Sequence, residues 1–407
     1  MTILYFIPSY DPALMGNRIH TEVIEHWRTH GVDAEVMTLA SGIHKTETTI
    51  YGDIRVHRLP SGGDIISKLS NRAFDTAMHY PYLGAALRHF KRFISNKRYD
   101  LIHIETAFPL GLVAALSVKH IPLAVTLPGA DIMAEPEFDY GYGRFRSVRM
   151  LLPFVFRRAA VLRADSPQIK SLAIYLGAPP ERVTAIPYNI TADSYPAAGM
   201  DLLKLRMAAR QRILSDHTLD PQRPIVVSLN RLHPFKGIEY LVEAIPEVQR
   251  AGIRPQVLIV GPNRQTPQFG DYGAYLQQRA HSMGIAEDVI LTGAVPHERT
   301  LDYLAAADAV VVPSVAESFS RVVVEAAAAG TPTLVTRTTG VSDYVSEFGC
   351  GLVVEPRSGE AIGQALVQLL SDRALWLSFT LRCPPMAARF SSARIGDELL
   401  DLYRPFL

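Results

Sequence analysis

Short apolar runs alternate with longer amphipathic stretches through the first half of the chain. Ile3–Ile7 is apolar and has the length of a buried strand, whereas Arg18–Thr29 carries apolar residues at the 3.6-residue spacing of a helix. Further runs predict strands at Ala34–Leu39, Ile54–Leu59, Leu101–Ile104 and Leu123–Thr126, and helices at Gly84–Ser95 and Leu110–Lys119. Strands separated by helices predict parallel βαβ units, doubly wound.

The same alternation restarts near Pro224, after a join, Tyr195–Pro224, that holds three prolines and one charged helical piece. We therefore expect an α/β protein with two halves, residues 1–195 and 196–385. In the second half, strands are predicted at Ile225–Leu229, Val257–Val260, Val289–Leu291, Ala309–Val312, Thr333–Val335 and Leu352–Val354. Helices are predicted at Ile238–Gln249, Tyr272–Ser282, Glu298–Ala306, Arg321–Ala329 and Ala361–Leu370.

Composition removes several classes of function. The 407 residues include 41 Lys and Arg and 40 Asp and Glu, so a nucleic-acid binder that works by overall positive charge is disfavoured. The two cysteines, Cys350 and Cys383, exclude a disulfide scaffold and a Cys-rich zinc module, and fit a reducing compartment. The apolar start is too short for a signal peptide, and the longest apolar runs fall short of the roughly 20 residues that span a bilayer. We expect a cytoplasmic location.

The loop after the first strand excludes some nucleotide chemistry. It holds one glycine, Gly16, rather than Gly-x-Gly-x-x-Gly, which disfavours a dehydrogenase. The chain has no Gly-Lys dipeptide for a standard Walker A loop, no His-Glu-x-x-His helix and no Gly-x-Ser-x-Gly elbow. Zinc hydrolases and ordinary serine esterases are disfavoured as well.

The most informative segment is Pro313–Pro332, which follows an apolar strand with a polar loop and a helix that begins near Ser320. Unpaired backbone amides at a helix N-terminus favour an anion such as a diphosphate. Glu317 lies in the loop and Glu325 about one and a half turns into the helix, so their carboxylates can face different parts of one ligand. Carboxylates that accept hydrogen bonds from pairs of hydroxyls suit a ribose or a sugar ring.

A second segment places two cations at the end of a predicted strand. Arg231 supplies a forked donor and Lys236 a compact charge, followed by Gly237. Together they are suited to neutralise a pyrophosphate leaving group, where charge builds during glycosyl transfer.

These motifs together resemble the family 4 glycosyltransferases of the GT-B fold, in which two Rossmann-like domains face each other across the active-site cleft. The resemblance covers nearly the whole chain. It rests on the Glu-x7-Glu pair (Glu317, Glu325), on Arg-x4-Lys-Gly (Arg231, Lys236, Gly237) and on Ala306–Asp308 before Pro313-Ser314. Ala164–Ser166 and Ile186–Asp193 are similar to the elements that end the family's first domain, and residues 386–407 to its C-terminal helix, which packs back on that domain.

The resemblance implies a retaining transferase that takes a sugar from a nucleoside diphosphate sugar, needs no metal or other cofactor, and has a hydroxyl acceptor, lipid-linked or not, bound in the first half. Donor and reacting groups would contact Glu317, Arg231, Lys236 and Asp131. Binding of the nucleotide sugar would involve Gly16, Arg231, Lys236, Ser318, Phe319, Ser320, Glu325 and Val295.

The sequence departs from the family pattern in three places. Gly16 is followed by Asn17 rather than a second glycine, and Ser320 stands where glycine is common. Many relatives have a histidine where Pro128 stands, touching the donor sugar. Either a neighbouring group (His103, Glu105 or Asp131) helps instead, or the donor is bound differently, or the enzyme is slow. A glycosyltransferase-like binding subunit without turnover, and a sugar-phosphate-using synthase or phosphorylase of the same fold, remain as alternatives.

Basic residues are concentrated in Arg144–Lys170, which holds seven Arg and Lys against Asp165 alone. The same stretch contains the apolar residues Met150, Leu151, Leu152, Phe154, Val155 and Phe156. This stretch is either a solvated helix face or a contact for anionic lipid or an anionic acceptor. Ser61–Tyr82 carries no recognisable motif and is interpreted as acceptor loops.

Overall fold

The computed structural model describes residues 1–407 except 13–14, 63, 198–199 and 407. The chain forms two compact units: unit 1 is Met1–Tyr188 with Ser392–Leu407, and unit 2 is Asn189–Ser391. The division precedes the expected one at residue 195 because the following segment bonds to the end of unit 2. The amide of Ile190 donates to the Phe390 carbonyl (3.0 Å), and the Tyr195 hydroxyl donates to the Ala387 carbonyl (2.7 Å).

Unit 1 contains an eight-stranded sheet in the order β3-β4-β2-β1-β5-β6-β7-β8, parallel except for the antiparallel pair β3–β4. The strands are β1 Thr2–Phe6, β2 Asp33–Ala40, β3 Glu47–Tyr51, β4 Ile54–Pro60, β5 Leu101–Glu105, β6 Leu123–Leu127, β7 Val161–Ala164 and β8 Val183–Ala185. The helices are α1 Met15–Thr29, α2 Ile65–Met78, α3 Leu83–Ile94, α4 Leu112–Ser117, α5 Arg146–Arg158, α6 Pro167–Tyr175 and α15 Ser392–Tyr403.

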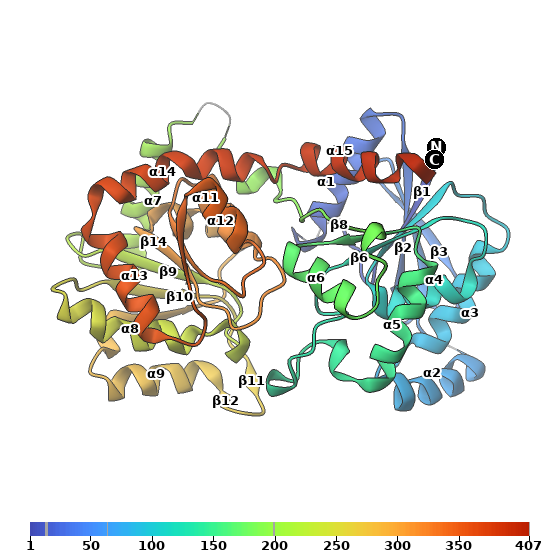
Figure 1. Ribbon diagram of the computed structural model, residues 1–407, viewed down its shortest axis with the longest axis horizontal. Coiled ribbons are helices and arrows are strands. Elements are labelled where there is room, and N and C mark those ends of the chain that lie inside the picture. The colour runs from blue at the N-terminus through green and yellow to red at the C-terminus, as the bar shows by residue number, and fades with distance from the viewer. Residues whose placement is uncertain (13–14, 63, 198–199, 407) are drawn as a thin grey trace. The chain divides into compact units, whose positions relative to one another are not determined.

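Unit 2 contains a six-stranded parallel sheet in the order β13-β10-β9-β14-β15-β16, and every strand predicted in this half is present. The strands are β9 Ile225–Leu229, β10 Gln256–Val260, β13 Val289–Gly293, β14 Ala309–Val312, β15 Thr333–Thr336 and β16 Gly351–Val354, with a small hairpin of β11 Gln265–Thr266 and β12 Gly270–Asp271. The helices are α7 Leu202–Asp216, α8 Ile238–Arg250, α9 Tyr272–Ser282, α10 Thr300–Ala306, α11 Arg321–Ala328, α12 Ser342–Phe348, α13 Gly359–Ser371 and α14 Arg373–Ala388. The two doubly wound parallel sheets confirm the predicted fold class (Figure 1).

The C-terminal helix α15 belongs to unit 1 and packs against α1. The indole of the buried Trp27 donates to the Gly396 carbonyl (3.0 Å), and the Ser392 hydroxyl donates to Glu22 (2.5 Å). Gly396 allows this close approach, since a Cβ built there would lie 2.6 Å from the ring of His26. Helix α15 begins at Ser392, six residues after residue 386, where the C-terminal helix was expected. The residues from 386 to Ala388 belong instead to the end of α14.

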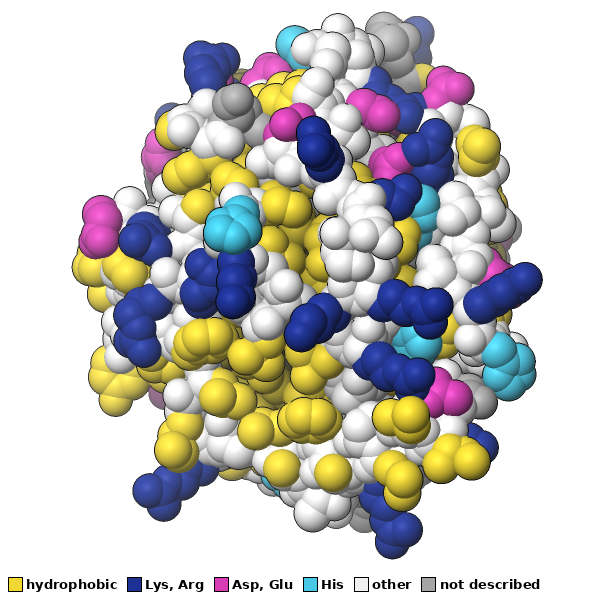
Figure 2. Space-filling model, turned by 90° about the vertical axis from the view of Figure 1, so that its right-hand side faces the viewer, with side chains coloured by type: hydrophobic (Ala, Val, Ile, Leu, Met, Phe, Trp, Pro, Cys, Tyr) yellow, Lys and Arg dark blue, Asp and Glu magenta, His cyan; other side chains and the backbone are white. Residues whose placement is uncertain are grey.

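Helix α2 replaces the loop expected over Ser61–Tyr82. Asp64 caps it by accepting the Ser67 amide (3.0 Å), but its apolar residues Ile65, Ile66 and Leu69 are 62–76% exposed. Because these apolar residues face outward, the sequence of α2 lacks the apolar stripe of a helix that packs against the core. Figure 2 shows hydrophobic and basic side chains gathered on one face of unit 1. Among the helices of the described chain, none combines the length and apolarity that crossing a bilayer requires.

Candidate functional site

The loop between β14 and α11 is held in place by the segment that follows β15. The amide of Gly340 donates to the Glu317 carbonyl (2.9 Å), and the amide of Val341 donates to the Phe319 carbonyl (3.1 Å). Ser320 takes a left-handed backbone (φ +84°), which costs a non-glycine residue free energy and explains why glycine suits this place. The loop thus enters α11 in a fixed conformation.

The two motifs marked by the sequence meet in unit 2. The Val315 amide donates to the Phe235 carbonyl (2.8 Å), and a Cβ built at Gly237 (φ +63°) would lie 2.1 Å from the Pro313 carbonyl oxygen. This close backbone contact brings the ammonium of Lys236 against the carboxylate of Glu317 in an ion pair. Both side chains are largely buried, with 11% and 15% of their surfaces exposed.

Arg231 lies at the surface after β9, in a segment that is closely packed. The amide of Leu232 donates to the Pro262 carbonyl (3.0 Å), and a Cβ built at Gly261 would lie 1.9 Å from the Asn230 carbonyl oxygen. Within the described part of the chain, the Arg231 guanidinium forms no hydrogen bond or ion pair. It is thus an exposed cation on a packed backbone segment, and its donors are open to an anion.

Glu325 on α11 is a largely buried residue whose carboxylate oxygens remain accessible. The residue is 9% exposed, and no hydrogen bond or ion pair reaches the carboxylate from the residues that the structure describes. Burial raises the pKa of Glu325, and the nearby charges of Arg321 and His297 oppose that rise. Its oxygens are not among the fully enclosed unpartnered atoms of the described residues, so they remain accessible and can accept hydrogen bonds from a ligand that supplies donors.

Sequence reasoning missed two neighbours of Glu325. His297, just after β13, lies 3.8 Å from the carboxylate of Asp193, and both charges act on Glu325. Asp193 ends the segment Ile186–Asp193, which resembles a family element, but nothing in the sequence links Asp193 to His297. Val295 is half-buried in the same loop after β13. The Gly261 amide donates to the Gly293 carbonyl (2.9 Å) at the start of this loop.

The site residues expected in the first half lie in unit 1. Gly16 is an exposed residue in the first turn of α1, and a Cβ built there would meet no atom within 4 Å. Asp131 is 1% exposed and accepts the amides of Ala107 (2.6 Å) and Gly129 (3.2 Å), which fixes the loops after β5 and β6. Burial raises the pKa of Asp131 to about 7, against these hydrogen bonds.

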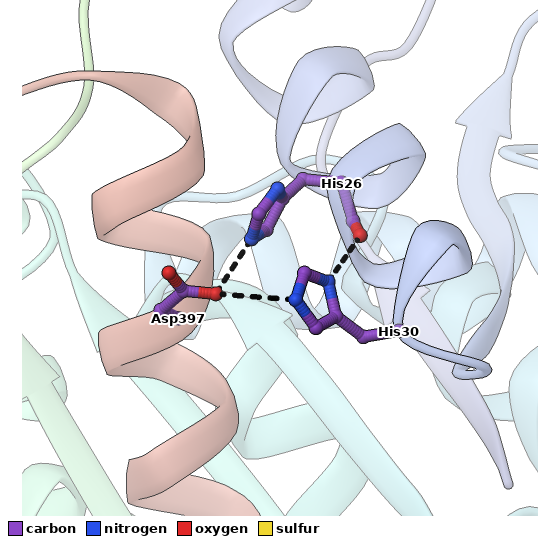
Figure 3. A group of neighbouring side chains, drawn as sticks. All are labelled: His26, His30 and Asp397. Carbon is purple, nitrogen blue, oxygen red and sulfur yellow. Dashed lines mark hydrogen bonds and ion pairs between the residues drawn. The ribbon is translucent and has the colours of Figure 1, made fainter.

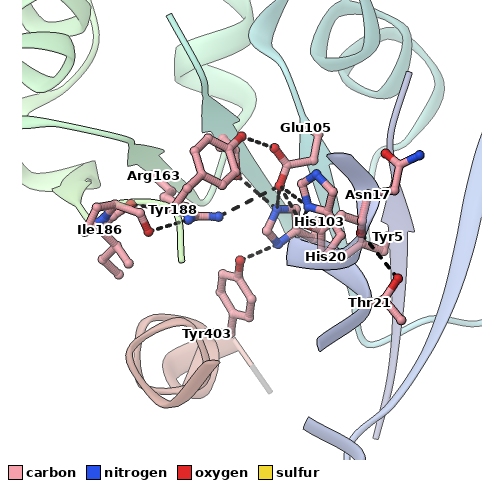
Figure 4. A network of polar contacts seen from close by, with 12 residues as sticks. Tyr5, Asn17, His20, Thr21, His103, Glu105, Arg163, Ile186, Tyr188 and Tyr403 are labelled. Carbon is pink, nitrogen blue, oxygen red and sulfur yellow. Dashed lines mark hydrogen bonds and ion pairs between the residues drawn. The ribbon is translucent and has the colours of Figure 1, made fainter. Parts of the chain in front are cut away.

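His103 and Glu105 belong to a buried polar network at the end of β5 (Figure 4). The His103 ring contacts Glu105 (2.9 Å) through Nε2 and the Tyr403 hydroxyl through Nδ1, so both nitrogens are engaged. Glu105 also accepts the hydroxyls of Tyr5 and Tyr188. Burial opposes ionisation of Glu105, but the His103 hydrogen bond and nearby positive charges hold its pKa well below the ordinary value.

Unit 1 also contains a pocket of about 450 Å³ beside the end of β6. Its walls combine aromatic faces with one cation and one carboxylate: His79, Tyr140, Tyr142 and Phe145 with Arg144 and Asp75. The His79 and Phe145 rings stack at 3.8 Å, and Arg144 lies 4.1 Å from the Phe145 ring centre. Such a mixture suits a ligand with both apolar faces and polar edges.

Comparison with known proteins covers both units. Residues 16–189 match the family model described as a glycosyl transferase 4-like domain, and residues 209–384 match that described as glycosyl transferases group 1. A D-inositol 3-phosphate glycosyltransferase from Nocardia farcinica is 34% identical over 239 residues, 58% of this chain and 50% of that protein. A GDP-mannose-dependent alpha-(1-6)-phosphatidylinositol monomannoside mannosyltransferase from Mycobacterium tuberculosis is 30% identical over 220 residues, 50% of this chain and 55% of that protein. The chain spans about half the length of these curated relatives.

Solved structures resemble the chain over its full length. Sucrose-phosphate synthase from Thermosynechococcus elongatus has a TM-score of 0.77 at 23% identity, over 100% of this chain and 99% of that one. HepE from Anabaena, solved with UDP and glucose, has a TM-score of 0.71 at 20% identity, over 100% of both chains. At these identities the likeness is one of fold.

Proposed function

The chain belongs to the family 4 glycosyltransferases of the GT-B fold, and from this we propose that it transfers a sugar from a nucleoside diphosphate sugar to a hydroxyl acceptor. The observation that carries the donor assignment is the carboxylate of Glu325, which belongs to a largely buried residue and receives no hydrogen bond from the described residues. Ribose offers two adjacent hydroxyl donors, which such a carboxylate accepts.

The reacting end of the donor would lie beside the side chains of Lys236 and Glu317. Arg231 and Lys236 would bind the diphosphate and neutralise the charge that develops on it as the bond to the sugar breaks. Glu317, with the backbone of Ser318–Ser320, would then hold hydroxyls of the donor sugar, and the base would contact the loop of Val295. We propose that the sugar keeps its anomeric configuration and that no metal or other cofactor takes part.

We place the acceptor in unit 1, in the aromatic pocket near Tyr142 and Arg144. Aromatic faces pack against the C–H face of a ring, while charged edges bind its hydroxyl or phosphate groups. Two relatives are named after molecules of this kind, D-inositol 3-phosphate and phosphatidylinositol monomannoside, which supports this proposal. This class of acceptor includes glycans, lipid-linked rings and small molecules.

Anionic surfaces are a proposed partner of unit 1. Arg146, Arg149 and Arg157 are exposed on α5, but its Leu152 and Phe156 are buried, so α5 offers charge rather than an apolar face. We propose peripheral contact with anionic lipid at the inner face of the membrane through the stretch Arg144–Lys170. Sedimentation with phosphatidylglycerol vesicles tests this, and binding equal to that of neutral phosphatidylcholine vesicles would contradict it.

A binding subunit without turnover is the second candidate. The observation that favours it is Pro128, which has no donor, in a unit where His103 and Glu105 are engaged in a buried network and Asp131 holds backbone amides. The same fold also serves synthases that use sugar phosphates, such as the sucrose-phosphate synthase structure. These alternatives share the donor site and differ in turnover and acceptor.

Release of nucleoside diphosphate without acceptor is the deciding experiment. UDP-glucose, UDP-galactose, UDP-N-acetylglucosamine, GDP-mannose and ADP-glucose are compared with the wild type, Glu325→Ala and Lys236→Ala. Glu287→Ala, at an exposed carboxylate of unit 2, is the matched control. Slow release from one donor, lost in the two site variants only, supports the transferase. Thermal stabilisation by UDP, GDP or ADP without release, even with inositol 3-phosphate or glucose 6-phosphate added, supports the binding subunit.

A further inference from the structure

Two histidines and one aspartate converge where the C-terminal helix crosses α1. His26 lies on α1, His30 directly follows it, and Asp397 lies on α15 (Figure 3). His26 Nε2 is 2.6 Å and His30 Nε2 is 3.9 Å from the same carboxylate oxygen of Asp397. One ligand atom from each residue lies within 4.8 Å of the others, so a single cation can reach all three.

Local hydrogen bonds prepare His30 for this role. Its Nδ1 lies 3.0 Å from the carbonyl oxygen of His26 and 3.1 Å from the Thr29 hydroxyl, which itself donates to that carbonyl (2.7 Å). Because the carbonyl can only accept and the Thr29 proton is already directed to it, Nδ1 carries the proton. The lone pair is then on Nε2, the nitrogen that faces Asp397. A backbone carbonyl that fixes the tautomer of a histidine in this way is the usual outer-shell partner of a metal ligand.

The same helix contact positions His26. Gly396 has no side chain, and the His26 ring occupies the space that a Cβ would take. The His26 ring therefore lies beside Asp397 and is only 17% exposed, whereas His30 and Asp397 are about half exposed. The site thus has one supported ligand and an open side through which an ion enters.

We propose that His26, His30 and Asp397 bind a divalent transition-metal cation of the zinc type. Imidazole nitrogens with one carboxylate suit Zn²⁺, whereas Mg²⁺ and Ca²⁺ take oxygen ligands. The ion would replace the proton that His26 Nε2 shares with Asp397 and leave at least one position for water. A bound ion would fasten α15 to α1 within unit 1 and so stabilise the fold. None of its three ligands is among the residues proposed for the transfer reaction, so the ion would not enter that reaction.

Zinc alone is the probe for this site. Untagged full-length protein, freed of metal with EDTA and dialysed, is titrated with ZnCl2 by calorimetry and melted with and without zinc. We expect one saturable site, a higher melting temperature with zinc, and no such effect of MgCl2. His30→Gln and Asp397→Asn should each weaken zinc binding at least tenfold and remove the thermal shift.

His281→Gln, at an exposed histidine of α9 in unit 2, is the control and should bind zinc like the wild type. His30 lies at the surface, so its variant should keep the wild-type circular dichroism spectrum. Unchanged zinc affinity in His30→Gln and Asp397→Asn would overturn the proposal, as would the lack of saturable binding up to about 1 mM zinc. In either case the cluster is only a surface ion pair between His26 and Asp397.

Discussion

The ammonium of Lys236 pairs with the carboxylate of Glu317, 81 residues further along the chain, and both are largely buried. The pair joins the two segments that the sequence marks separately. A diphosphate that binds Lys236 must compete with Glu317, and the freed carboxylate can then accept hydroxyls of the donor sugar. Each residue is therefore expected to act on a different part of the donor.

Glu317→Gln should separate binding from turnover. Removing the negative charge frees Lys236, so the affinity for UDP or GDP without a sugar should stay equal or increase. Turnover of the sugar nucleotide should fall about 100-fold, the usual effect of losing one positioned polar group at a reacting centre. Calorimetric binding of the diphosphate and a steady-state assay measure the two quantities. A large loss of diphosphate affinity would contradict the proposed competition.

Lys236→Gln should have the opposite effect on binding. It removes a charged hydrogen-bond donor to the diphosphate, which is worth about 1.5–3 kcal/mol, so affinity for the diphosphate should fall roughly 10- to 100-fold. Thermal stabilisation by the diphosphate reports the loss. Equal affinity in this variant would place the diphosphate elsewhere.

Glu325→Gln should be more stable than the wild type at pH 7 yet bind nucleotide more weakly. The pKa of Glu325 is raised in the native state, so between the unfolded and native pKa values the native state binds more protons. Stability therefore falls as pH rises through that window and stays lower above it. The variant lacks this loss, and its melting temperature should exceed the wild-type value by about 2 °C at pH 7 and match it near pH 4.

Nucleotide affinity of Glu325→Gln should fall about tenfold, because a neutral amide replaces a charged acceptor. Melting curves at pH 4 and pH 7 with a calorimetric titration of UDP and GDP check both effects. A variant less stable than the wild type at pH 7 would show that an unrecognised partner holds the carboxylate.

The strands of unit 2 could be predicted because each is a short apolar run between polar loops. Ala309–Val312 and Thr333–Thr336, for example, are buried throughout, and the sequence offers no competing helical pattern there. The contact between Lys236 and Glu317 could be expected only from the family resemblance. What brings them together is the carbonyl of Pro313 against Gly237, a long-range packing detail with no local signal.

Unit 1 was predicted less completely because its elements break the usual patterns. Strand β3 pairs at the sheet edge with all five residues exposed, and α2 points its apolar residues outward. His103 illustrates the limit at single residues. In the apolar run Leu101–Ile104 it could be a site residue or a core residue. Its full burial and its contact with Tyr403, 300 positions away, show that it lies in the core, and neither can be read from the local sequence.

Asp131→Ala should destabilise unit 1. It leaves the buried amides of Ala107 and Gly129 without an acceptor, at a cost of about 1–3 kcal/mol each. Asp131→Asn keeps one acceptor oxygen and should lose less.

The native pKa of about 7 for Asp131 means that wild-type stability falls as pH rises from about 4 to 7 and then levels off. Melting curves across this range check the slope, which the Ala variant should lack. If Asp131 instead contacts the donor, both variants keep the wild-type melting temperature and lose turnover.

Substituting alanine at two glycines should give opposite results. Gly237→Ala puts a Cβ 2.1 Å from the Pro313 carbonyl oxygen at a positive φ, so the loop that carries Lys236 must move. We expect loss of diphosphate binding and a melting temperature lower by several degrees.

The Cβ introduced by Gly16→Ala meets no atom within 4 Å in α1, so this variant should leave stability unchanged or slightly higher. If Gly16 admits the donor phosphates as the family resemblance implies, this variant loses turnover at wild-type stability. Full turnover in Gly16→Ala would remove Gly16 from the donor site.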